Sequence, residues 1–159
     1  MRRTDLAVTD PRMMEAVLRR GLVCRLGLLR EGLPYIVPLS YGYEDGCLYF
    51  HCAGEGLKLE CIRECRRVCF QVDCGVRVRE AAEACGWTMD YSSVIGYGTV
   101  SEIEDCEEKM RALRILMGHY SGREDWEIPA SLLDTTTVLK LPIDSMTGKS
   151  STGGPEEDE

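Results

Sequence analysis

A glycine-rich corner followed by a lysine is the part of this sequence whose residue types most clearly suggest chemistry. Residues 53–58 have the sequence AGEGLK, with glycines at positions 54 and 56. Glycine lets a backbone turn sharply and approach a bound group closely. Lys58 would lie in the first turn of the helix that follows, where free N–H groups favour an anion. The sequence therefore predicts a phosphate-binding site at Lys58.

The net charge strengthens this prediction. The chain has 19 Lys and Arg residues against 27 Asp and Glu residues, a formal charge of −8, which argues against a nucleic-acid partner. An acidic protein that binds an anion must gather cations locally, and Arg63, Arg66 and Arg67 follow Lys58, with Lys149 as a further candidate. For the arginines, a solvated surface that balances nearby glutamates is the favoured interpretation.

Two strands are expected to position this corner. Residues 34–43 alternate between two kinds of side chain, which predicts a strand with two different faces. A turn over residues 44–46 (EDG) leads into a second, apolar strand over 47–52 that contains His51. A lone strand histidine usually has a structural role. His51, however, precedes the glycine corner by three residues, and imidazole titrates near neutral pH.

The rest of the chain supplies the other elements. Gly96 and Gly98, within a strand rich in β-branched and aromatic residues, indicate a bulge or a close neighbour. The connection over 74–90 has the composition for two helical turns. The remaining predicted elements are a helix from Asp10 to Gly21, strands over 23–29, 67–73, 91–102 and 135–142, and helices over 58–64 and 105–120.

This order has no repeating βαβ unit, and short loops force antiparallel pairing of the first strands. It predicts a mainly β fold, a small barrel with peripheral helices. The length of 159 residues suits one domain, over residues 1–150, and the acidic tail over 151–159 is expected to be disordered. We find neither an apolar run of membrane-spanning length nor a secretory signal, so we expect a cytoplasmic protein.

Nine cysteines require an explanation. Their odd number and the absence of a signal peptide argue against a secreted disulfide framework. Cys61, Cys65 and Cys69 follow one another at intervals of four, without the C-x2-C pair usual at zinc and iron–sulfur sites. Core packing is the favoured interpretation, and a metal or redox sensor is the alternative.

Five segments in order resemble the pyridoxamine 5′-phosphate oxidase-like flavin proteins, and most closely their nitroimidazole-resistance reductase branch. They are PYIVPLSYGY, LYFHCAGEGLK, RRVCFQVD, YSSVIGYGTV and TGKS; with the first ten residues they cover nearly all of residues 1–150. The resemblance implies a split β-barrel that works as a homodimer, with FMN at each of two sites along the subunit interface. FAD is the alternative cofactor, and haem is a less favoured one.

The resemblance also implies roles for individual residues. The backbone of residues 37–39 would follow the isoalloxazine edge, the serines after Tyr91 would lie near the phosphate, and His51 would orient substrate or donate a proton. The implied cofactor-binding residues are Val37, Pro38, Leu39, Ser40, His51, Cys52, Ala53, Lys58, Tyr91, Ser92, Ser93 and Lys149.

The function that follows is an FMN-dependent oxidoreductase that passes electrons from a reduced donor to a small acceptor such as a nitroaromatic compound. Because the chain has no GxGxxG fingerprint, a nicotinamide donor would contact the flavin directly or transiently. Pyridoxamine-phosphate oxidation is disfavoured, since the C-terminal arginine and histidine pattern of the true oxidases is missing. A flavin-binding module without efficient turnover is the main alternative, because a fold does not determine a function.

Overall fold

The structure, a computed structural model, describes residues 3–123 and 125–154. Its helices are α1 (Pro11–Arg20), α2 (Leu57–Glu64), α3 (Cys106–Ser121) and α4 (Ala130–Thr135), with 3-10 turns at Thr4–Leu6 and Ala84–Gly86. Its strands are β1 (Ala7–Val8), β2 (Cys24–Arg30), β3 (Leu33–Leu39), β4 (Gly42–Glu44), β5 (Cys47–Ala53), β6 (Arg67–Arg79), β7 (Thr88–Thr99), β8 (Ser101–Ile103) and β9 (Thr136–Ser150).

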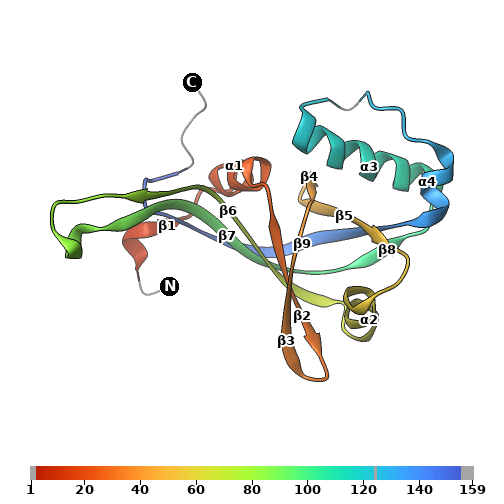
Figure 1. The fold of residues 1–159 in the computed structure, drawn as a ribbon, viewed down its shortest axis with the longest axis horizontal. Helices are drawn as coiled ribbons and strands as arrows, with labels where there is room; N and C mark the ends of the chain where they lie inside the picture. Colours follow the sequence, from red (N-terminus) through yellow and green to blue (C-terminus); the bar gives the residue numbers. More distant parts are fainter. Residues whose placement is uncertain (1–2, 124, 155–159) are drawn as a thin grey trace.

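The strands form one sheet in the order β3-β2-β6-β7-β9-β5-β4, with β1 and β8 paired to β9. The pairings are antiparallel, and the helices lie at the periphery (Figure 1). The predicted class, mainly β with peripheral helices, is confirmed. Among the described residues, no helix is long and apolar enough to span a membrane.

Local signals in the sequence set the ends of several elements. The Asp10 side chain accepts a hydrogen bond from the Arg12 backbone N–H at 2.9 Å and caps α1, which ends before Gly21. Asp105 caps α3 in the same way, accepting from the Glu108 N–H at 2.8 Å. The turn between β4 and β5 places Gly46 at a φ of 73°, which glycine adopts readily.

The helical turns expected over residues 74–90 are a wrong prediction. β6 continues to Arg79, and β7 begins at Thr88, so the two strands form a long hairpin that extends from the body of the sheet (Figure 1). Arg77 pairs with Asp90 and Val78 with Met89. These cross-strand pairs outweigh the helical propensity of the alanine- and glutamate-rich segment, which is confined to the tip.

The last strand is also longer than predicted. β9 pairs with β5 along its first half and with β7 along its second half, so it links the two ends of the molecule. Beyond β9, the Ser151 backbone N–H donates to the Tyr91 carbonyl at 3.0 Å. Residues 155–159, most of the tail predicted to be disordered, lie outside the described residues.

Two apolar clusters form the core, and β5 contributes to both. Leu48 and Phe50 belong to the larger cluster inside the sheet, whereas Tyr49 belongs to a smaller cluster beneath α3. Alternate residues of β5 therefore face α3. Cys106, the first residue of α3, is exposed. The buried residues of this helix are Ala112, Leu113, Ile115 and Leu116.

The cysteines are free thiols. Cys24 and Cys61 are buried in the larger cluster, and burial raises the pKa of the Cys24 thiol to about 12, which leaves it unreactive near neutral pH. Cys65 and Cys69 are half-buried. Within the part of the chain that the structure describes, no three His, Cys, Asp or Glu side chains form a group able to hold a metal ion.

The predicted close neighbour of Gly98 is present, and it makes a stability prediction possible. The β7–β9 register shifts between Tyr97 and Gly98. A Cβ atom on Gly98 would overlap the Pro142 carbonyl oxygen and lie 2.6 Å from Leu141 Cδ1. We expect Gly98→Ala to lower the free energy of unfolding by about 3 kcal/mol, the cost of forcing an extra atom into a packed site, as measured by urea denaturation.

Gly27→Ala is the matched control, because a Cβ there would meet its nearest neighbour, the Cys69 carbonyl oxygen, at 3.4 Å. The control should change the free energy of unfolding by less than about 1 kcal/mol. Equal midpoints for the two variants would show that β7 and β9 do not approach each other closely at Gly98.

Candidate functional site

The first part of the site lies where the end of β3 and the end of β5 separate from each other. Gly42 of β4 pairs with Tyr49 of β5. If this pairing continued by two residues, Ser40 would lie opposite His51. The strands separate at this point, because β3 pairs with β2 and the end of β5 pairs with β9. The predicted site segments 37–40 and 51–53 therefore lie on the two sides of one split in the sheet.

The segment 37–40 can offer a ligand mainly its backbone. Val37 and Leu39 are half-buried and pack against the core, whereas Pro38 and Ser40 are exposed. β3 is an edge strand of the sheet, so the peptide groups along its free side have no partner strand. An edge is also the position that proline tolerates within a sheet. Free peptide groups are what the pyrimidine edge of a flavin requires.

The beginning of α2 has the features of an anion site. Its N-cap is Gly56, at a φ of 124°, which has no side chain to cap the first-turn N–H groups. A Cβ on Gly56 would meet nothing within 4 Å, so the space in front of the corner is open. These N–H groups, together with the positive end of the helix dipole, favour a negative charge.

Lys58 joins α2 to the end of β5. Burial raises the pKa of the Cys52 thiol, and the neighbouring Lys58 ammonium, which can donate a hydrogen bond to it, opposes that rise. The lysine is half-buried rather than extended into solvent. Lys58, Cys52 and the glycine corner are thus brought together, as the sequence predicted.

Two of the three arginines that follow Lys58 interact with carboxylates. Arg63 Nε and Nη2 lie 2.8 and 3.0 Å from the two carboxylate oxygens of Glu102, and Arg67 pairs with Asp144. Each charge is therefore balanced, in line with the favoured interpretation, although the partners are not the helix glutamates. Among these candidates Lys58 is the cation at the glycine corner.

The other predicted residues lie at the far end of β9. The Lys149 ammonium lies 5.5 Å from the centroid of the Tyr91 ring, and Ser93 is the residue paired with Lys149 across β7 and β9. Ser92 points to the opposite face of the sheet. Its hydroxyl lies 2.9 Å from the Ser150 hydroxyl, and the residue is 2% exposed. Ser93 and Lys149, but not the Ser92 hydroxyl, are thus directed to one face of the sheet.

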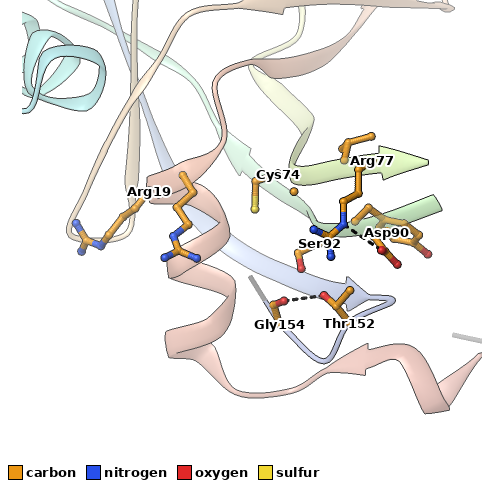
Figure 2. Close-up of a pocket in the computed structure, with 11 residues that line it drawn as sticks. Arg19, Cys74, Arg77, Asp90, Ser92, Thr152 and Gly154 are labelled. Carbon is orange, nitrogen blue, oxygen red and sulfur yellow. Dashed lines mark hydrogen bonds and ion pairs between the residues drawn. The ribbon is translucent and has the colours of Figure 1, made fainter. Parts of the chain in front are cut away.

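Beside Ser92 is a cavity of about 650 Å³ at the base of the long hairpin (Figure 2). Asp90, which is 6% exposed, lies 3.2 Å from guanidinium nitrogens of both Arg77 and Arg79. The guanidinium of Arg19 is directed away from this pair (Figure 2). The sequence reasoning missed this ion-pair cluster around a buried aspartate. Its signal in the sequence was a pair of arginines two residues apart on one strand and an aspartate on the next.

A single chain does not bring the two parts of the site together. His51 pairs with Val138 near the start of β9, and Ser93 pairs with Lys149 near its end. Lys149 follows Val138 by 11 residues along this strand, a distance of roughly 35 Å for an extended chain. That distance is longer than a flavin mononucleotide, so a single ligand does not contact both parts within one chain.

The sheet face that carries Ser93 and Lys149 also carries exposed apolar side chains. Ile36, Ile95 and Tyr97, which are 66%, 45% and 48% exposed, lie on it. The register connects them, because Ile36 pairs with Gly27, Gly27 with Cys69, and Cys69 with Tyr97. The buried residues of α1 and α2 pack on the opposite side, in the larger core cluster. Exposed apolar side chains gathered on one face are typical of interaction surfaces.

Residues 10–150 match the profile of the family described as pyridoxamine 5′-phosphate oxidase. A solved structure of a candidate 5-nitroimidazole antibiotic resistance protein from Bacteroides thetaiotaomicron is 33% identical, with 91% of this chain and 86% of that chain covered and a TM-score of 0.81. An FAD-binding protein from Mesorhizobium loti is 25% identical, with 89% and 95% covered and a TM-score of 0.65.

A third solved structure shows likeness of fold alone. The FAD- and haem-binding protein from Mycobacterium smegmatis is 22% identical, with 96% of this chain and 76% of that chain covered and a TM-score of 0.80. No curated protein matches the chain. The fold is thus shared with flavin-binding proteins.

Proposed function

Because this chain belongs to the pyridoxamine 5′-phosphate oxidase family, we propose that it is an FMN-dependent oxidoreductase with small nitroaromatic compounds as acceptors. The observation that carries the proposal is the open beginning of α2, where Lys58 lies between uncapped N–H groups and the end of β5. The nitroaromatic acceptor rests on the 33% identity to the candidate 5-nitroimidazole resistance protein.

The residues present fit a flavin. Lys58 and the first-turn N–H groups of α2 would hold the phosphate, and the free edge of β3 would meet the pyrimidine ring. FMN needs no further binding surface, whereas the adenylate of FAD, the alternative cofactor, would need one. The mass of the cofactor released from purified protein distinguishes the two.

The reaction requires two electrons and two protons for each nitro group that becomes a nitroso group and water. A bound flavin supplies the electron chemistry, by accepting two electrons from a donor and passing them to the acceptor. The chain supplies orientation and protons. His51 is exposed at the end of β5, where its imidazole can hydrogen-bond a nitro oxygen and donate a proton.

We further propose that the working unit is a homodimer. The two parts of the site lie at opposite ends of β9, and a second copy that packs on the open sheet face would bring the Lys149 of one chain toward the Lys58 of the other. The exposed Ile36 and Tyr97 side chains would then be buried. The apolar face and the divided site thus support the same assembly.

Single-turnover kinetics test the proposed activity without requiring the natural donor. The flavoprotein is reduced anaerobically with dithionite and mixed with 1-methyl-5-nitroimidazole, and reoxidation is followed by flavin absorbance. We expect reoxidation faster than that of free reduced FMN, and a rate constant about 100-fold lower for His51→Asn, since general acids contribute at least this factor.

The matched control is the second histidine of the chain, His119, whose Nε2 lies 2.7 Å from the Gly21 carbonyl oxygen. His119→Asn should keep the rate constant within about threefold, because His119 lies outside the predicted site. A native protein that holds flavin but reoxidises no faster than free FMN would leave a flavin-binding module as the function.

A further inference from the structure

A second cavity lies on the other side of β5 from the larger core cluster. Its volume is about 280 Å³, and its lining comes from β5, α3, α4, the start of β9 and the loop between the two helices. The β5 residue in the lining is His51. Because Tyr49, two residues earlier, packs in the cluster beneath α3, the alternation of the strand directs His51 to this side as well.

The lining is almost entirely apolar. α3 contributes Leu113, Leu116 and Met117, α4 contributes Leu132, and the loop contributes Trp126. Its ionisable members are His51 and the carboxylate of Glu127, and it contains no lysine or arginine. A site without a cation does not offset the desolvation of an anionic ligand, whereas a neutral apolar ligand gains from its burial.

The wall formed by Trp126 is held in place. Its indole N–H donates to the Ser121 hydroxyl at 2.9 Å, and the Arg123 guanidinium lies 5.1 Å from its ring centroid. The charge of Arg123 is paired with Asp125 at 2.9 Å, so it is not available to an anion in the cavity. A fixed indole beside aliphatic side chains favours a flat aromatic ligand, which can stack on the ring or meet its edge.

We propose that this cavity binds a neutral, single-ring aromatic molecule, with His51 as the polar group that fixes its orientation. Its volume lies just below the usual range of about 300–1,000 Å³ for small-molecule pockets, which suits one ring with small substituents. If the proposed function holds, this molecule is the acceptor. His51 belongs both to the cavity lining and to the 51–53 segment of the flavin site, so the ligand lies next to the cofactor.

Nitrobenzene and benzoate provide matched probes, because they have the same shape and differ in charge. In a Trp87→Phe background, the tryptophan emission comes from Trp126 alone, and binding is followed by its quenching in oxidised holoprotein without any electron donor. We expect saturable quenching by nitrobenzene and at least tenfold weaker binding of benzoate. Free tryptophan corrects for collisional quenching.

Two variants test whether nitrobenzene binds in this cavity. Leu132 lines the cavity and is 44% exposed, so Leu132→Glu should fold and should weaken nitrobenzene binding at least tenfold by placing a carboxylate in the apolar lining. Leu22, which is 66% exposed and lies outside the lining, supplies the control, and Leu22→Glu should leave the affinity within twofold. Equal affinities for nitrobenzene and benzoate, or an unchanged affinity in Leu132→Glu, would overturn the proposal.

These measurements distinguish the proposed ligand cavity from the proposed reductase activity. Binding that depends on Leu132, in a protein whose reduced flavin does not react with nitro compounds, supports the cavity and contradicts the acceptor chemistry. Rapid reoxidation by 1-methyl-5-nitroimidazole that Leu132→Glu leaves unchanged, together with unchanged nitrobenzene binding, supports the activity and rejects the cavity.

Discussion

Lys58→Ala is expected to weaken flavin binding by about 10- to 100-fold. A charge-assisted hydrogen bond to a phosphate is worth about 1.5–3 kcal/mol, and each 1.4 kcal/mol corresponds to a factor of ten in the dissociation constant. Lys58 is half-buried beside Cys52, at a helix start whose cap residue is Gly56. Its ammonium is therefore placed where water weakens the interaction less than on an open surface. Titration of flavin-free protein with FMN, followed by flavin fluorescence, measures the change.

Arg63→Ala is the matched control, because Arg63 lies on the same helix and is a cation with a similar stem. Its guanidinium already interacts with Glu102 through two hydrogen bonds, so its removal should change the dissociation constant for FMN less than threefold. Thermal unfolding of both variants checks that the helix is intact. If both substitutions weaken binding equally, the effect is one of net charge, and the phosphate is not bound at the glycine corner.

The parts of the fold that were predicted correctly depend on residues that are close together in the sequence. Asp10 and Asp105 cap helices through side-chain hydrogen bonds to residues two and three positions later. The alternation of residues 35–39 follows directly from burial on one side of β3. The glycine N-cap of α2 and the position of Lys58 in its first turn likewise depend on a few neighbouring residues; that this corner binds a phosphate stays a prediction.

The parts that were not predicted depend on residues distant in sequence. The long hairpin of β6 and β7 exists because Arg77 and Val78 pair with Asp90 and Met89, and no window of local sequence contains both strands. The resemblance brought Lys58 and Lys149 to one flavin site. Within one chain, however, Lys58 follows the end of β5 that pairs with the start of β9, and Lys149 lies near the other end of β9. The cavity beneath α3 depends on α4, which is not among the predicted elements.

The second prediction concerns the flavin affinity of dimers in which the two subunits carry different lysine substitutions. Lys149→Ala alone is expected to weaken flavin binding about tenfold, and Lys58→Ala by at least as much, so homodimers of either variant should have an FMN dissociation constant at least about ten times the native one. A heterodimer of one Lys58→Ala chain and one Lys149→Ala chain should instead bind one FMN per dimer with native affinity. Co-expression with two different affinity tags isolates this species, and flavin absorbance measures its occupancy.

The reason for this expected rescue is geometric. If each site takes Lys58 from one subunit and Lys149 from the other, the heterodimer has one site with both lysines and one site with neither. If each site lies within a single chain, every site of the heterodimer lacks one lysine, and its affinity should equal that of the weakened homodimers. Lys58 follows the end of β5, which pairs with the start of β9, whereas Lys149 lies near the other end of β9. Only the shared arrangement therefore lets both lysines contact one flavin, and a heterodimer without native-affinity binding would reject it.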